Sequence, residues 1–84
     1  MEIYELTPKN GQKSFYGKAF VIYNEGVKYL GSYNTIVASI QPDGTVKRHW
    51  DGWSATTGKH LRSFYGIRKK DWDKMPVESV GVNF

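Results

Sequence analysis

The sequence predicts a small α+β domain, in which an antiparallel sheet of three to five strands carries one packed α-helix. The clearest sign of the sheet is the alternating run at 35–41, which is followed by the turn-forming tripeptide Pro42-Asp43-Gly44. The sign of the helix is the stretch at 54–65, which opens on a capping serine and is followed by a glycine. A chain of 84 residues has room for a single domain of this kind, spanning residues 1–84.

Five short segments have the β-forming composition of strands. They are separated by turn signals, among them Asn10-Gly11 and Asn24-Glu25-Gly26. The expected strands are 3–6, 18–23, 27–33, 35–41 and 45–50. A further short strand is expected at the end of the chain, where Val80, Val82 and Phe84 alternate.

The turn at 42–44 also predicts how the fourth and fifth strands pair. With residue 41 opposite residue 45, the pairs on one face are Ile40 with Val46, Ala38 with Arg48 and Ile36 with Trp50. This face is the predicted core face, because it holds both isoleucines and the tryptophan. Arg48 is expected at the sheet edge, with its stem buried and its charged head in water. The opposite face then carries Lys47 and His49, next to Val37 and Ser39.

Residues 54–65 are predicted to form the helix. Ser54 is the expected N-cap, with Thr56 and Thr57 as alternatives, and Gly66 is the expected left-handed residue after the last turn. Gly58 costs the helix up to about 1 kcal/mol, so the helix must depend on packing. The predicted core is Ile36, Ile40, Trp50, Leu61 and Phe64, and the charged segment 68–74 is expected to be a loop or short turn pinned by Trp72.

Composition excludes several classes of protein. The chain has no cysteine, which excludes disulfides and thiolate metal sites. His49 and His60 lie on different predicted elements and lack the spacing of a ligand pair, so no metal and no cofactor is predicted. No apolar run approaches the roughly 20 residues of a membrane helix, and the N-terminus lacks the pattern of a secretory signal. The expected location is the cytoplasm, away from any membrane.

Catalytic patterns are weak, and the protein is predicted not to be an enzyme. Ser54, His60 and Asp51 can be written as a Ser-His-Asp set, but no glycines of a nucleophile elbow frame the serine. Residues 52–59 have five residues between two glycines, where a phosphate-binding loop has four. A weaker expectation is an anion at the helix N-terminus beside Ser54, Thr56 and Thr57, although plain N-capping explains the same hydroxyls.

Charge is uneven along the chain. Residues 1–43 have no net charge, whereas residues 44–74 carry eight basic side chains against three acidic ones, a net charge of +5. This excess predicts a basic surface that faces a polyanion, or else an ordinary solvated face. The candidate binding residues are Lys47, Arg48, His49, Lys59, Arg62, Arg68, Lys69 and Lys70. A more compact alternative is Arg62 with 68–70 around the helix C-terminus, where cations also complement the helix dipole.

One pattern spans residues 32–64. It consists of Tyr33-Asn34-Thr35 with Val37-Ala38, then Trp50, then Trp53-Ser54-Ala55-Thr56-Thr57, followed by His60 and Phe64. In this pattern the chain resembles an uncharacterised family of short proteins from tailed phages and other mobile elements, classed as a domain of unknown function. The resemblance implies a mobile-element origin. It assigns no catalytic or binding residue.

Two classes of function are expected, and both stay open at this point. The first is a non-enzymatic phage or mobile-element protein that binds a host protein or nucleoprotein as a takeover or counter-defence factor, an anti-CRISPR inhibitor being one form. The alternative is a small basic protein that binds DNA or RNA through a basic and aromatic face of the sheet or helix. The family resemblance favours the first class slightly, and salt dependence separates the two because phosphate contacts weaken steeply with salt.

Overall fold

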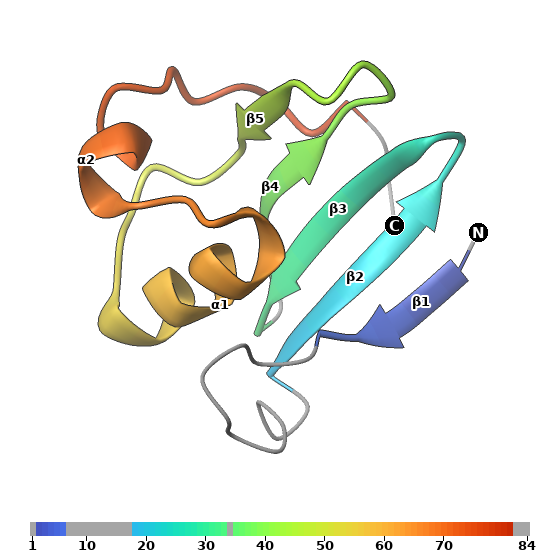
Figure 1. The fold of residues 1–84 in the computed structure, drawn as a ribbon, viewed down its shortest axis with the longest axis horizontal. Helices are drawn as coiled ribbons and strands as arrows, with labels where there is room; N and C mark the ends of the chain where they lie inside the picture. The colour runs from blue at the N-terminus through green and yellow to red at the C-terminus, as the bar shows by residue number, and fades with distance from the viewer. Residues whose placement is uncertain (1, 7–17, 34, 82–84) are drawn as a thin grey trace.

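A computed structural model describes residues 2–6, 18–33 and 35–81, which form a five-stranded antiparallel sheet with two helices on one side (Figure 1). The strand order is β1-β2-β3-β4-β5, so each strand pairs with its neighbour in the chain. The strands are β1 Glu2–Glu5, β2 Ala19–Asn24, β3 Val27–Ser32, β4 Thr35–Ile40 and β5 Val46–Arg48. The helices are α1 Ala55–Tyr65 and α2 Lys69–Trp72. The predicted α+β class is confirmed.

Tight turns fix the register of the sheet. Between β2 and β3, Glu25 and Gly26 both have positive φ (53° and 82°), which gives the hairpin turn whose twist matches that of the strands. Between β4 and β5, the Asp43 carboxylate accepts the Thr45 N–H at 2.9 Å, and this hydrogen bond lowers the pKa of Asp43. The predicted pairs Ala38–Arg48, Ser39–Lys47 and Ile40–Val46 are confirmed.

A β-bulge in β4 changes the face on which Ile36 lies. Leu30 pairs with Ala38 but its neighbour Gly31 pairs with Ile36, so Val37 is the extra residue. Val37 and Ala38 are both buried in the core, whereas Ile36 lies beyond the bulge on the opposite face and is half-buried. The prediction that Ile36 lies under the helix is therefore wrong, because one inserted residue inverts the alternation of the strand.

The core fills the space between the helices and one face of the sheet, here called the helix-side face, which carries Val21, Leu30, Ala38 and Arg48. Its buried residues are Leu6, Ala19, Val21, Leu30, Val37, Ala38, Leu61, Ile67 and Trp72. Of the predicted core residues, Leu61 is fully buried, whereas Trp50 and Phe64 pack against the cluster while partly exposed. Ile40 lies on the helix-side face but is only half-buried. Trp72 is fully buried, as expected of the residue that pins this segment.

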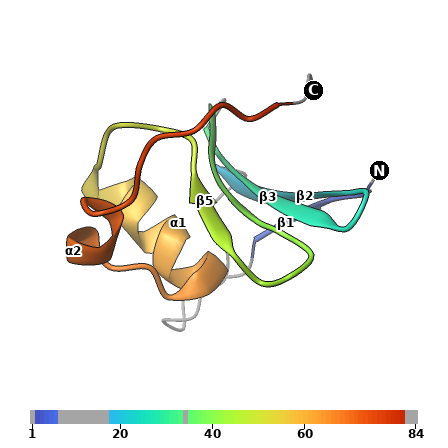
Figure 2. The ribbon, with the colours of Figure 1, turned by 90° about the horizontal axis from the view of Figure 1, so that it is seen from above.

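After α2 the chain runs along the outer edge of β5 and crosses to the face of the sheet away from α1 (Figure 2). This far face carries Ile22, Tyr29, Ser39 and Lys47. Val77 makes an isolated parallel bridge with Arg48, and the Glu78 N–H donates to the Arg48 carbonyl at 2.7 Å. Residues 78–81 are not a strand, so the terminal strand expected at Val80 is not found. Val82 and Phe84 lie outside the described residues.

Candidate functional site

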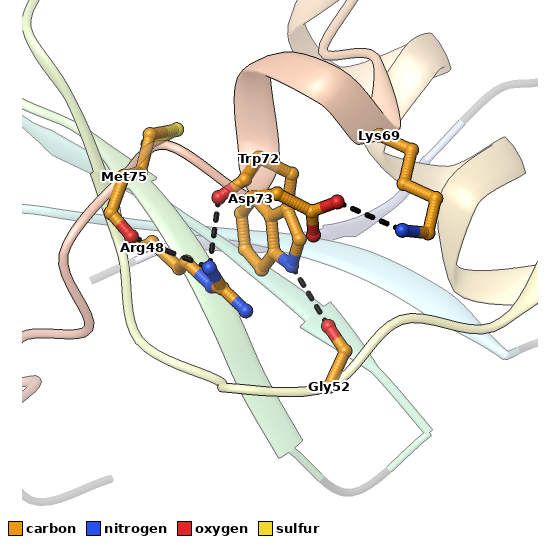
Figure 3. A network of polar contacts seen from close by, with 6 residues as sticks. All are labelled: Arg48, Gly52, Lys69, Trp72, Asp73 and Met75. Carbon is orange, nitrogen blue, oxygen red and sulfur yellow. Dashed lines mark hydrogen bonds and ion pairs between the residues drawn. The ribbon is translucent and has the colours of Figure 1, made fainter.

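The Arg48 side chain is an internal anchor and not a surface charge. It is 8% exposed. Its Nε donates to the carbonyl of Trp50 at 2.8 Å. Its Nη1 donates to the carbonyls of Trp72 at 2.8 Å and Met75 at 3.3 Å (Figure 3). The expectation that its head lies in water is wrong, because three backbone carbonyls, one in the loop after β5 and two at or after the end of α2, accept hydrogen bonds from it.

The ring of Trp72 completes this anchor. The Arg48 guanidinium carbon lies 4.8 Å from the ring centroid, in the geometry of a cation–π contact. The Trp72 indole N–H donates to the Gly52 carbonyl at 2.8 Å (Figure 3). Together the two side chains join β5, the following loop and α2. The charge of Arg48 is used inside the fold, so it does not add to a binding surface.

His49 is also held by internal contacts. Its Nε2 lies 2.8 Å from the Ser39 hydroxyl, and this hydroxyl accepts a hydrogen bond from the Gln41 side-chain amide at 2.9 Å. Its Nδ1 lies 2.8 Å from the Glu78 carbonyl, which can only accept, so Nδ1 carries the proton. The histidine therefore ties the C-terminal segment to β5. Lys47 lies on the far face and is half-buried, so the structure does not bring it together with the cations of the helices.

The N-terminus of α1 is capped within the chain. Ser54 has extended backbone angles (φ −138°, ψ 160°), and its hydroxyl accepts the Thr57 N–H at 3.1 Å. The predicted N-cap is thus confirmed, as is Gly66, which adopts φ 71° and donates its N–H to the Arg62 carbonyl. Thr56 is exposed. The Ser54 hydroxyl, beside which an anion was expected, therefore already accepts a hydrogen bond from the first turn of α1.

A buried polar group lies beneath α1. The Ser32 hydroxyl is 2.8 Å from His60 Nδ1 and 3.0 Å from the Thr57 hydroxyl. His60 is 1% exposed. Its pKa is lowered by burial and, to a smaller extent, by the charge of Lys18. These contacts join His60 to β3, whereas the Ser54 hydroxyl of the Ser-His-Asp set caps α1 by accepting the Thr57 N–H.

Trp53 fixes how α1 sits against the loop that precedes it. A Cβ at Gly58 would lie 2.5 Å from Cζ2 of the Trp53 ring, which is too close for any side chain. The same ring lies 6.4 Å from the ring of Trp72, centroid to centroid. The glycine that weakens the helix locally is required for this packing, and the tryptophan connects α1 to the Arg48 anchor.

Four exposed cations of the helical layer make no ion pair with another described residue, and we call them the basic surface: Lys59, Arg62, Arg68 and Lys70. Lys59 and Arg62 lie three positions apart on the outer side of α1. Arg68 precedes α2, and Lys70 stands two positions before the buried Trp72, on the outer side of that short helix. Among the described residues none of the four makes an ion pair, whereas Lys69 pairs with Asp73 at 2.8 Å.

Sequence analysis missed a simple signal for this surface. Residues 52–70 contain five cations and no aspartate or glutamate. Residue Tyr65 in the same stretch is 51% exposed although it is a large aromatic side chain. The acid-free stretch could have been recognised in the sequence, whereas the exposure of Tyr65 could not, because Trp53 and Phe64 lie in the same stretch and are partly buried.

An open cavity of about 240 Å³ adjoins the basic surface. It lies between β5, the end of α1 and α2, and its lining residues are Val46, Tyr65, Gly66, Ile67, Asp71 and Met75. Most of these residues are apolar, and Asp71 supplies the charged group. Asp71 could not be singled out from the sequence, because nothing in its neighbourhood along the chain places it beside Tyr65.

Within the described residues, no group of three or more histidine, cysteine, aspartate or glutamate side chains is placed to hold a metal ion. No helix in this part of the chain has the length and apolar character needed to cross a membrane.

These features define a small α+β domain in which a five-stranded meander carries a basic helical layer. The chain belongs to a family described as Family of unknown function (DUF8033), whose sequence model matches residues 4–75. The expected membership of an uncharacterised family is thus confirmed, over a longer stretch than residues 32–64. No curated protein and no solved structure matches the chain.

Proposed function

We propose that the protein is a non-enzymatic nucleic-acid-binding protein that contacts phosphate groups through its basic surface. The observation that carries this proposal is the set of four exposed cations, without an ion pair among the described residues, in a stretch, 52–70, that contains no acidic residue. Contacts to phosphate groups supply nearly all of the affinity of a protein for nucleic acid that does not depend on the nucleotide sequence. Arginine is well suited to this role because its planar guanidinium makes two parallel hydrogen bonds to phosphate.

Folding accounts for only part of this charge distribution. A cation in the last turn of a helix, such as Arg62 in α1, complements the helix dipole, but the exposed cations outside a last turn have no such role. Like charges three or four positions apart destabilise a helix by a few tenths of a kcal/mol, about as much as opposite charges stabilise it. α1 carries Lys59 and Arg62 without an acidic residue in its first turn. By contrast, the cations that do serve the fold have clear partners: Arg48 has three carbonyls and Lys69 has Asp73. The exposed cations therefore support binding to a polyanion.

The family resemblance favoured a host protein or nucleoprotein slightly over nucleic acid as the partner, whereas the exposed cations favour nucleic acid. The proposal retains the expectation of a phage or mobile-element protein that acts in the cytoplasm of the host cell. A nucleoprotein target is compatible with it, since the nucleic acid of such a complex offers the same phosphates.

A host protein is the second candidate, and a separate observation favours it. Tyr4 and Tyr23 are 48% and 39% exposed on the helix-side face, beyond the part that α1 covers. Tyr4 pairs with Val21, two positions before Tyr23, so the two tyrosines are diagonal neighbours on adjacent strands. Exposed tyrosines are enriched at the centres of protein interfaces.

Binding measurements with charge-reversal variants test the proposal. Fluorescence anisotropy with labelled single-stranded DNA, duplex DNA and RNA at low salt gives the affinity of each. The variant Arg62→Glu/Lys70→Glu should lose about tenfold or more in affinity, because two attractive contacts become repulsive. Lys28→Glu/Lys47→Glu is the matched control, since it changes the net charge equally but lies on the sheet.

Three results would distinguish the alternatives. Equal losses in both double variants would mean that net charge alone matters and that no basic surface exists. Absence of binding by the wild-type protein at low salt would refute the proposed function. Capture of a host protein that survives nuclease treatment and is lost in Tyr4→Ala/Tyr23→Ala would support the second candidate instead.

A further inference from the structure

The cavity beside the basic surface is the feature that the proposed phosphate contacts leave unexplained. Its floor is apolar: Ile67 is 6% exposed, and Val46 and Met75 are partly buried. Tyr65 forms part of the wall and is 51% exposed, so the ring is in contact with both the cavity and solvent. At about 240 Å³ the cavity is smaller than the usual pocket of a drug-sized ligand, and it fits one flat ring system.

The position of the cavity relates it to the cations. Tyr65 follows Arg62 by three positions on α1, and Asp71 follows Lys70 directly on α2. A strand whose phosphates lie on Arg62 and Lys70 therefore passes the mouth of the cavity. An exposed tyrosine beside such a strand is a typical stacking partner for an unpaired base.

Asp71 restricts what can enter. An ionised carboxylate only accepts hydrogen bonds, and it repels phosphate. Among the described residues Asp71 forms no ion pair, although cations precede it in the chain. The group that enters must therefore present N–H donors and not a negative charge. Guanine presents two adjacent donors, N1–H and the N2 amino group, on one edge. Adenine and cytosine present one amino group beside an acceptor, and thymine and uracil one N–H between two carbonyls.

We propose that this cavity binds a single unpaired guanine base of a single-stranded nucleic acid, stacked on Tyr65 and hydrogen-bonded to the Asp71 carboxylate. The inference depends on the proposed function and adds to it the strandedness and the base preference of the ligand. Single strands are required because the edge that Asp71 reads is occupied in a duplex.

The test compares short strands that differ at one base. The probes are an eleven-nucleotide oligothymidylate and the same strand with guanine, adenine, cytosine or hypoxanthine at the centre. Guanine should bind about tenfold more tightly than thymine, since a good two-bond contact discriminates at this level. Hypoxanthine keeps N1–H but lacks the amino group, so its affinity should lie between the two.

Variants separate base recognition from simple electrostatics. Asp71→Asn should raise the affinity for oligothymidylate, because a negative charge near the phosphates is removed, and should abolish the preference for guanine. If the Asp71 carboxylate has no role in base recognition, Asp71→Asn should change the affinities for oligothymidylate and for the guanine-containing strand by the same factor. Asp51→Asn, at an exposed position outside the cavity, is the control and should leave the preference unchanged. Tyr65→Leu should weaken binding of every strand, whereas Tyr65→Phe should retain it.

The outcomes separate this inference from the proposed function. Binding that is strong and salt-sensitive but equal for all central bases would refute the guanine site and leave phosphate binding intact. Equal affinity for guanine and hypoxanthine would refute the two-bond contact. Absence of binding to every strand would refute the proposed function itself.

Discussion

Replacing Arg48 by methionine tests whether a buried cation holds the two layers together. The side chain donates to the carbonyls of Trp50, Trp72 and Met75 and lies against the ring of Trp72. Methionine has a similar volume but no donor, so all three hydrogen bonds are lost, and of the three carbonyls that of Trp72 still accepts the Met75 N–H at 3.1 Å. Each hydrogen bond to a charged group contributes about 1.5–3 kcal/mol, and a carbonyl that stays buried without a partner costs a similar amount.

The expected loss is about 3–5 kcal/mol of unfolding free energy, because two of the three hydrogen bonds are short and one is long. A domain of 84 residues has about 4–12 kcal/mol in total, so the variant should be close to unfolding. Arg48→Lys should lose about 2 kcal/mol, since an ammonium group keeps the charge but cannot reach all three carbonyls.

Urea unfolding followed by tryptophan fluorescence gives both values. Arg62→Met on the exposed side of α1 is the control and should change stability by less than about 0.5 kcal/mol. If Arg48→Met unfolds at the same urea concentration as the wild type, the anchor does not stabilise the fold and the reasoning fails.

Three further predictions concern α1. Gly58→Ala should lower the melting temperature, because the new Cβ would lie 2.5 Å from the Trp53 ring. In an unhindered helix the same change stabilises by about 1 kcal/mol. Adding Trp53→Leu should remove the loss of stability, and an unchanged loss would contradict the packing of Gly58 against Trp53. The free energy of unfolding should fall as the pH drops below about 6.5. The pKa of His60 is lower in the folded chain than in the unfolded chain, so acid protonates the unfolded chain first and favours it. Urea midpoints between pH 7.5 and pH 5 should show this fall in the wild type and less of it in His60→Gln, and equal falls would contradict the assignment. Ser54→Ala should cost about 1 kcal/mol by loss of the cap, with Ser54→Asp restoring it, and an unchanged melting temperature in Ser54→Ala would be inconsistent with the cap.

Local sequence signals were sufficient for most of the fold. The turn at Pro42-Asp43-Gly44 predicted the register of β4 and β5, and the serine and glycine around 54–66 predicted both ends of α1. The bulge at Val37 could not be predicted, because the alternation of Ile36, Ala38 and Ile40 is the pattern of an unbroken strand. The bulge depends on packing between strands, which leaves no trace in a single stretch of sequence.

The candidate site was predicted in part. A basic surface was expected from the charge excess of residues 44–74, but the sequence does not show which cations the fold uses internally. Lys47, Arg48 and His49 are consecutive, but Arg48 points to the carbonyls at the end of α2, whereas His49 contacts Ser39 and the Glu78 carbonyl on the other side of the sheet. Asp71 enters the cavity because α2 packs beside β5, which is a tertiary contact.

The most direct test of phosphate binding is the dependence of affinity on salt. For single strands, the logarithm of the association constant falls with the logarithm of the salt concentration by about 0.7 for each phosphate contacted. Four cations on the basic surface give an expected slope of about −3 for an eleven-nucleotide oligothymidylate. The slope of Arg62→Glu/Lys70→Glu should be about half as steep. A wild-type slope near zero, or one that stays the same in this variant, would contradict nucleic-acid binding through α1 and α2.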